Sequence, residues 1–340
     1  MAETIFVVGG EQRGVPHWTK EWRLYKRALV VKVANGKLQR VLEYESPSAH
    51  RPDEPSAILF KSASVVGNRA YLCTQTEILI CDFPSFEILK IISLPCFNDI
   101  HHVAVAPDGR LFVAVTGLDA VAELASDGEL ISLTSVLGGS VWDRFSSEVD
   151  YRKVLTTKPH RSHPNFIFFL DGEPWVTRFE QRDALPLNGS GRERPAFKLG
   201  SEGVHDGHVD GDYIYFTSVN GFVRRFSLLS GEEQIFDLNI MRAAGESRPL
   251  GWCRGVLPRA AEIWVGFTRI RYTELRQNID WIRRGFRDAD RYPPAPTRIA
   301  CYDLANRLLI EEIDVEQAGM NTIFSVHRGS GVDGSSQVTQ

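Results

Sequence analysis

Apolar and polar residues alternate with a period of two along most of the chain, in short runs separated by turn residues. Successive side chains of a β-strand point to opposite faces, so this alternation predicts half-buried strands. Patterns typical of an amphipathic helix are few. The hydrophobic pattern therefore predicts an all-β protein.

The strand-like runs come in groups of four, bounded by Asp-Gly and Asn-Gly turns. Five complete groups span residues 59–94, 101–133, 165–199, 205–238 and 255–313. A sixth group is supplied by three runs near the N-terminus (4–8, 28–33 and 37–44) and one near the C-terminus (322–326). Repeating units of roughly 40 residues are typical of a β-propeller.

These groups predict a single β-propeller domain over residues 1–328, most simply with six four-stranded blades, although five or seven stay open. Strands from both termini would close the ring and so remove exposed sheet edges. Residues 329–340 are rich in Gly, Ser and Gln and are predicted to be a disordered tail.

Composition narrows the functional class. The 340 residues carry a net charge of −4 and are 43% hydrophobic, which gives no reason to expect binding to nucleic acid or to a membrane. Five scattered cysteines favour reduced thiols and a cytoplasmic location. The N-terminus shows a strand pattern rather than a signal peptide, and no apolar run is long enough to span a membrane.

One segment resembles known propeller families. An inner strand followed by a Pro-Asp-Gly turn, in His101–Leu124, is similar to repeats of the NHL, SMP-30/gluconolactonase and virginiamycin-lyase propellers. Pro164-Asn165 resembles a calcium-binding element of the SMP-30 family. That resemblance implies a Ca²⁺-dependent lactonase-like activity, with Asn98, Asn165 and Asp206 as oxygen ligands. The stretch 163–183 also looks like an uncharacterised bacterial propeller family.

Histidines gather at the predicted starts of the inner strands. Antiparallel geometry puts these starts, and the loops between the second and third strands, on one face of the ring. When the blades are aligned by their first turns, Cys253, Lys61 and Asn321 occupy the position in their blades that histidines occupy in the others. His327 falls on the opposite face, and His17, His50 and His160 are interpreted as surface residues. The histidines expected at the mouth of the axis are His101, His102, His163, His205 and His208.

Several imidazoles near one axis predict a metal site with open coordination positions. Neutral imidazole is the commonest protein ligand of Fe, Zn, Cu and Ni, and the same set suits Mn. A strand bulge is needed to turn both His205 and His208 inward. Asp99, Asp206 and Glu180 are candidate general bases or hydrogen-bond acceptors for the rings. A hydrogen-bonded turn histidine is the alternative for each ring taken alone.

Basic residues around the same mouth predict an anion clamp. The candidates for substrate binding are Lys61, Arg178, Arg182, Arg254 and Arg269. Ion pairing of these cations with Asp183, Glu180 and Asp119 is the alternative. Long insertions at 9–27, 135–162 and 270–297 should cover this face. The last contains a predicted helix over residues 272–286 with a basic face, either solvated or acting as a lid.

Three functions remain open from the sequence. The first is a metalloenzyme acting on a small anionic substrate by oxygenase, lyase or hydrolase chemistry. The second is the Ca²⁺-dependent lactonase-like hydrolase. The third is a non-catalytic propeller that binds a peptide or protein partner across the decorated face.

Overall fold

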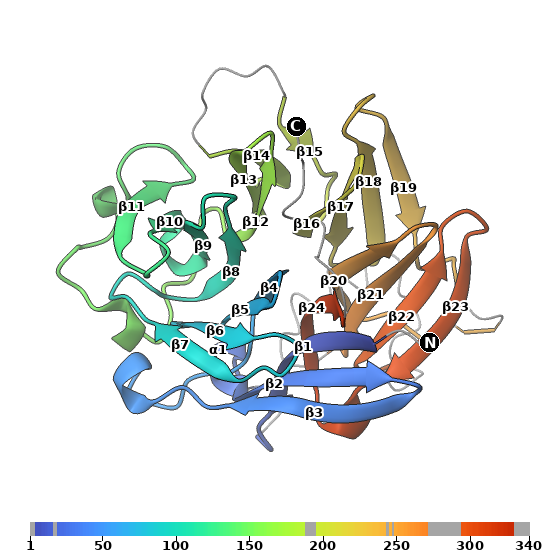
Figure 1. Ribbon diagram of the computed structural model, residues 1–340, viewed down its shortest axis with the longest axis horizontal. Coiled ribbons are helices and arrows are strands. Elements are labelled where there is room, and N and C mark those ends of the chain that lie inside the picture. The colour runs from blue at the N-terminus through green and yellow to red at the C-terminus, as the bar shows by residue number, and fades with distance from the viewer. Residues whose placement is uncertain are drawn as a thin grey trace.

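The computed structural model describes residues 4–15, 19–187, 195–242, 245–246, 248–270 and 294–329. Its strands form six antiparallel four-stranded sheets arranged around a common axis (Figure 1). The predicted number of blades is therefore confirmed. The predicted helix at 272–286 lies outside the described residues, as do His17 and nearly all of the predicted tail.

Both termini contribute to the closing blade, as the sequence predicts. C-terminal strand β24 pairs with β1, which continues into β2 and β3. The strands of this blade are β24 (Thr322–Arg328), β1 (Thr4–Gln12), β2 (Tyr25–Ala34) and β3 (Lys37–Tyr44).

The other five blades are each made of four consecutive strands. The next two contain β4 (Ser62–Val66), β5 (Arg69–Cys73), β6 (Ile78–Asp82) and β7 (Ile88–Ile92), then β8 (Ile100–Val105), β9 (Leu111–Val115), β10 (Ala120–Leu124) and β11 (Leu130–Ser135). The fourth has β12 (Pro164–Leu170), β13 (Glu173–Arg178), β14 (Asp183–Pro186) and β15 (Phe197–Lys198). The last two contain β16 (Val204–Asp210), β17 (Tyr213–Ser218), β18 (Phe222–Ser227) and β19 (Glu233–Asp237), then β20 (Trp252–Arg259), β21 (Glu262–Thr268), β22 (Arg298–Asp303) and β23 (Leu308–Asp314).

Helical structure among the described residues is short. The α-helix α1 spans Glu21–Leu24, and five single 3-10 turns lie in the connections. These turns are η1 (Ser48–His50), η2 (Thr116–Leu118), η3 (Val141–Asp143), η4 (Tyr151–Lys153) and η5 (Glu316–Ala318). The described residues include no helix long and apolar enough to cross a membrane.

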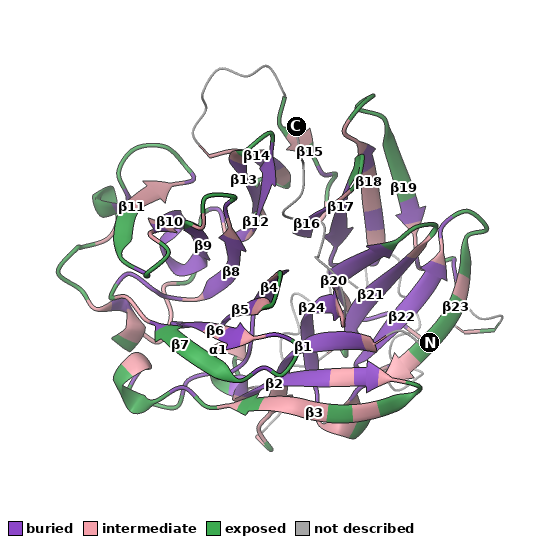
Figure 2. Cartoon of the chain, viewed as in Figure 1, coloured by how far each residue is buried: buried purple, intermediate pink, exposed green. Residues whose placement is uncertain are grey.

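The first strand of each blade lies innermost. Strands β4, β8, β12, β16, β20 and β24 contact their neighbours around the axis, and β24 contacts both β20 and β4. These strands are buried, whereas outer strands such as β7 and β23 are largely exposed (Figure 2). The apolar faces of neighbouring blades pack together, and each of the six interfaces has its own cluster of buried side chains.

All five cysteines are buried, four in strands and Cys96 in the connection before β8, and none is in a disulfide. Burial raises the pKa of the Cys73 and Cys81 thiols to about 12 and that of Cys96 to about 11. The thiols are therefore packing groups in the protonated form.

The ring closes through a close approach of two backbones. A Cβ atom added at Gly9 would lie 1.8 Å from the carbonyl oxygen of Thr322. The two backbones pair here with a shift in register, and neither can move without opening the closing blade.

We predict that Gly9→Ala lowers the free energy of unfolding by about 3 kcal/mol, the upper range for overpacking a buried site. Urea unfolding measures this change. Gly14→Ala is the matched control, because nothing lies within 4 Å of a Cβ atom there. Equal stability of the two variants would contradict the tight closure.

Candidate functional site

Four consecutive inner strands are irregular at the same level of the ring. The register of pairing between the first and second strands of the blade shifts between Ile100 and His102 in β8, and between Pro164 and Phe166 in β12. It shifts again between His205 and His208 in β16, and near Gly255 in β20. A bulge leaves an extra residue unpaired and changes where neighbouring side chains point. The bulge expected in β16 is therefore present, and it has counterparts in three neighbouring blades.

The bulges divide the axial side chains into two levels. His101, His163 and His205 lie at the entrance with Lys61 and Asp99, as their mutual contacts show. His102 and His208 line a separate cavity further along the axis. The five histidines expected in one cluster thus belong to two.

At the entrance, a chain of polar contacts runs from Lys61, which precedes β4, through β8 and β12 to β16. Lys61 Nζ lies 3.1 Å from Asp99 Oδ1 and 3.3 Å from His101 Nε2. On its other side, His101 Nδ1 is 3.0 Å from Asn165 Oδ1. Asn165 Nδ2 donates to the carbonyl of Val204 at 2.7 Å, so its oxygen faces the histidine. His101 therefore carries its proton on Nδ1, and its Nε2 accepts from Lys61.

The charge states follow from burial and partners. Burial lowers the pKa of His101 to about 4, and the Lys61 cation acts in the same direction, so the ring is neutral near pH 7. Burial alone would raise the pKa of Asp99. The Lys61 cation outweighs that effect, with His101 adding to it as the Asp99 carboxylate titrates, and holds the pKa of Asp99 well below its usual range. A buried Lys⁺–Asp⁻ pair thus lies against a neutral imidazole.

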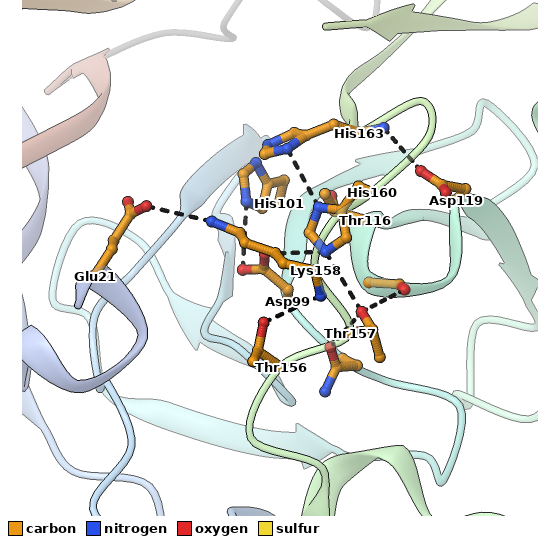
Figure 3. Close-up of polar contacts among 12 residues, drawn as sticks. Glu21, Asp99, His101, Thr116, Asp119, Thr156, Thr157, Lys158, His160 and His163 are labelled. Atoms are coloured by element: carbon orange, nitrogen blue, oxygen red, sulfur yellow. Dashed lines mark hydrogen bonds and ion pairs between the residues drawn. The ribbon is translucent and has the colours of Figure 1, made fainter. Parts of the chain in front are cut away.

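A second chain of contacts fixes the tautomer of His163 (Figure 3). The Thr157 hydroxyl donates to the carbonyl of Gly117 at 2.6 Å, so its oxygen accepts from His160 Nε2 at 3.4 Å. Asp99 Oδ2 lies 4.0 Å from the same nitrogen and favours the proton there. Neutral His160 then accepts at Nδ1 from His163 Nδ1, 3.3 Å away. His163 Nε2 is left with its lone pair.

Burial keeps both of these rings uncharged. It lowers the pKa of His160, and it holds the pKa of His163 well below the usual range, with the neighbouring rings of His101 and His160 adding to the effect. The rings of His101 and His163 meet edge to face, with centroids 4.7 Å apart.

Asp119 holds the loop that carries these histidines. Its Oδ1 accepts from the backbone N–H groups of Ser162 and His163, both at 2.8 Å. Its Oδ2 accepts from Arg161 N at 2.9 Å and Arg144 Nη1 at 2.6 Å. Burial would raise the pKa of this carboxyl, but these partners outweigh it and lower the pKa. The left-handed backbone of His163, with φ of 58°, is thereby fixed.

Two long connections cover the entrance, as the strand polarity predicts. Lys158, from the connection before β12, lies 3.4 Å from Glu21 Oε2 in α1 (Figure 3). The same ammonium is 5.8 Å from the centre of the Trp22 ring. These residues, with Lys61 and Asp99, line a cavity of about 20 Å³, which has room for about one water molecule. A larger ligand must displace this cover.

His205 and Arg254 bring two unpartnered nitrogens to the same level. His205 is 6% exposed, and its Nε2 has no hydrogen-bond partner among the described residues. The buried Nε of Arg254 has none either. The guanidinium lies 4.6 Å from the centre of the Phe324 ring, and Phe179 contacts His205 with centroids 5.5 Å apart. Burial and the Arg254 charge hold the pKa of His205 well below its usual range.

The lower cavity is also about 20 Å³ and is lined by all six inner strands. His102 stacks on Phe166, accepts from Ile167 N at 3.2 Å and lies 3.3 Å from the Ser64 hydroxyl. Both of its nitrogens are therefore engaged, and burial lowers its pKa to about 3. His327 joins this level, 2.9 Å from the Ser325 hydroxyl. Its exclusion from the entrance is thus consistent with the structure.

Asp206 lies between the two levels. Its Oδ2 accepts from Gly255 N at 3.1 Å and from the Thr217 hydroxyl. Burial raises its pKa to about 6 against these hydrogen bonds and against the nearby Arg254. The carboxyl thus titrates in a range where few aspartates do.

The donor geometry does not fit the expected metal ion. No group of three or more His, Cys, Asp or Glu side chains in the described parts of the chain is arranged to hold one. The Lys61 ammonium occupies the ring edge that His101 would offer to a cation. His160 and His163 use one nitrogen each on one another.

The oxygen ligands expected for calcium are also engaged separately. Asn98 donates to the carbonyls of Tyr151 and Val154, while Asn165 and Asp206 have the partners given above. Nothing in these contacts joins the three side chains into one oxygen-lined site.

Four of the other candidates have surface positions or structural partners. Glu180 and Arg182 are in an exposed turn. Arg178 pairs with Asp183 at 2.6 Å and bonds the carbonyl of Val136, and exposed Arg269 pairs with Glu316. The ion-pair alternative thus describes Arg178 and Arg269, although Arg269 pairs with a residue outside the predicted set. Lys61 and Arg254 remain the two predicted cations at the entrance.

The sequence reasoning missed two entrance residues. The side chain of His160, interpreted as a surface residue, is only 2% exposed. Lys158 lies in the same connection, which lacks the period-two pattern by which the strands were found. The spacing His160-x-x-His163 is the one signal that pointed to this loop.

Comparison with known proteins shows the fold. No family model and no curated protein matches the sequence. A protein of unknown function from Bacteroides caccae is similar in structure, with a TM-score of 0.60 and 12% identity over 96% of this chain and 98% of that chain. A streptogramin B lyase structure matches with a TM-score of 0.50 and 12% identity, over 94% and 91%.

The chain is a six-bladed β-propeller. At these identities the likeness shows the fold alone, so the propeller's function is argued from its own side chains.

We predict that Asp206→Asn gains stability relative to the wild type as pH rises. The folded-state pKa is raised, so the wild type is favoured while the carboxyl is protonated and loses stability as pH rises from the ordinary value of 3.8 through about 6. A pKa raised by this much corresponds to about 3 kcal/mol. Urea unfolding at about pH 4 and about pH 8, on either side of the raised pKa, measures the difference. The exposed Asp212→Asn is the control, and a pH-independent difference for Asp206→Asn would contradict the raised pKa.

Proposed function

We propose that this propeller is an enzyme that transfers protons to and from a small molecule at the entrance of its axis, with His163 as general base. The observation that carries the proposal is the Thr157–His160–His163 chain, which leaves the His163 Nε2 lone pair free. An oriented imidazole of known tautomer is what general base catalysis requires.

The surrounding groups support this role. His160 and Thr157 are positioning residues, because they fix the His163 tautomer through hydrogen bonds. Asp119 positions the backbone of His163. Because burial lowers the pKa of both rings, His163 stays in its base form through neutral pH.

Lys61 supplies the complementary charge. Its ammonium is 4% exposed and is oriented by Asp99 and His101. A fixed cation in a site shielded from water stabilises negative charge that develops on a substrate when a proton is removed. The base and the cation come from different blades, and His101 lies between them with a contact to each.

Of the reaction classes left open by the sequence, lyase-type elimination fits these groups. His163 removes a proton from carbon, the Lys61 charge stabilises the resulting negative charge, and the leaving group on the next carbon departs with its bonding electron pair as the double bond forms. The structural neighbour whose name is streptogramin B lyase shares the fold with this chain. That likeness is consistent with an enzymatic role and says nothing about the substrate here. No step of the proposal passes through a metal ion, because the donor set does not fit one.

The test is solvent deuterium exchange into a panel of α-keto acids, β-hydroxy acids and lactones, followed by ¹H NMR in D₂O. We expect the wild type to accelerate exchange with at least one panel member. His163→Asn should lower that rate by about 100-fold, a typical contribution of a general base. Thr157→Val keeps His163 but frees its tautomer, and should lower the rate by about tenfold.

Glu180→Gln is the matched control, because this acidic candidate lies in an exposed turn and should leave exchange unchanged. Equal rates for His163→Asn and wild type, or no exchange above buffer with any panel member, would overturn the proposal in favour of a non-catalytic binding propeller. Loss of exchange on chelation, restored by one added metal, would instead support the metal hypothesis.

A further inference from the structure

Two buried nitrogens at the entrance have no partner among the described residues: Nε2 of His205 and Nε of Arg254. Buried polar atoms are nearly always hydrogen-bonded, so two such nitrogens at one level of the axis are available to a ligand. The two residues come from neighbouring blades, in β16 and β20. These two strands are in contact, and Asp206, next to His205, accepts at 3.1 Å from the backbone N–H of Gly255, next to Arg254. The Arg254 charge is also the largest charge effect on the His205 ring.

From these groups we infer that Arg254 and His205 bind the carboxylate of an organic acid. The inference rests on the proposed function and names its substrate class. The Nε edge of a guanidinium presents two parallel N–H groups at the spacing of the two carboxylate oxygens. In the neutral His205 ring, a proton on Nε2 supplies a third donor.

The nearby carboxylates do not fill this position. Asp99 is paired with Lys61, and Glu21 lies against Lys158. Asp206 is held by Gly255 and Thr217 on its Oδ2. Arg254 contacts the Phe324 and Trp252 rings instead, which orient the guanidinium without using its hydrogen-bond donors.

Aromatic side chains next to Arg254 and His205, which together form the carboxylate clamp, favour an apolar group on the acid. Phe324 lies beneath both Arg254 and Lys61, and Phe179 contacts both His205 and His163. An acid with an apolar or aromatic group therefore fits better than acetate or inorganic phosphate. Phe179 thus lies between the ring of His205 and that of His163, so a carboxylate held by the clamp and the base share one aromatic neighbour.

The probe is benzoate labelled with ¹³C at the carboxyl carbon, titrated against the full chain and followed by NMR. We expect saturable binding, weaker for acetate and phosphate. Arg254→Gln should weaken benzoate binding by about tenfold or more, the loss typical of a charge-assisted pair. Arg254→Lys keeps the charge without the Nε edge and should also lose affinity. Binding of benzoate should raise the pKa of the His205 ring, read from its ¹³C shifts.

Arg182→Gln is the matched control, because this exposed arginine lies outside the cluster. Equal benzoate affinity of Arg254→Gln, Arg182→Gln and wild type, or no binding by a folded wild type, would overturn the inference. Circular dichroism verifies that each variant is folded, and His205→Phe tests the second donor if Arg254→Gln unfolds.

The two proposals fail separately. His163→Asn should bind benzoate normally while losing deuterium exchange. If exchange depends on His163 but benzoate binding does not depend on Arg254, the carboxylate clamp alone is contradicted. Binding that depends on Arg254 without any exchange would leave a carboxylate-binding site and remove the catalytic role.

Discussion

The arrangement of the site depends on the irregular register of the inner strands. A regular strand points alternate residues toward the axis, so His101 and His102 could not both face it. The bulge in β8 turns both rings inward at different heights, and the bulge in β16 does the same for His205 and His208. The residues at the bulges then bond across blades, as His101 does with Asn165 and Asp206 with Gly255.

Most of the fold could be predicted from the sequence because it depends on local signals. Alternation of apolar residues identified the strands, and Asp-Gly and Asn-Gly turns separated them. The strands of the closing blade were found because three runs at one end of the chain lacked a fourth, which the other end supplies. The connections were harder to predict, because their path is set by contacts such as Asp119 with the 161–163 backbone.

The site was only partly predictable, for physical reasons. Strand polarity correctly placed Lys61 with His101 and His163 at the entrance. It could not show which cations were already paired, and Arg178 and Arg269 have carboxylate partners within the sheets or connections. It also could not separate two levels along the axis, because the depth of a side chain depends on the exact position of each bulge. The expected metal cluster rested on counting histidines. The contacts that engage His101, His102 and His163 are with Lys61, Asn165, Ile167, Ser64 and His160, and these contacts do not follow from the count.

The buried cysteines have a practical consequence for work on this protein. Their thiols are enclosed between blades, and burial keeps those of Cys73, Cys81 and Cys96 protonated far above neutral pH. Maleimide and iodoacetamide reagents attack exposed thiolates, so the native cysteines should not react with them while the fold is intact. A single cysteine introduced at the rim would then accept a fluorophore or spin label selectively, and could report how the two connections over the axis separate.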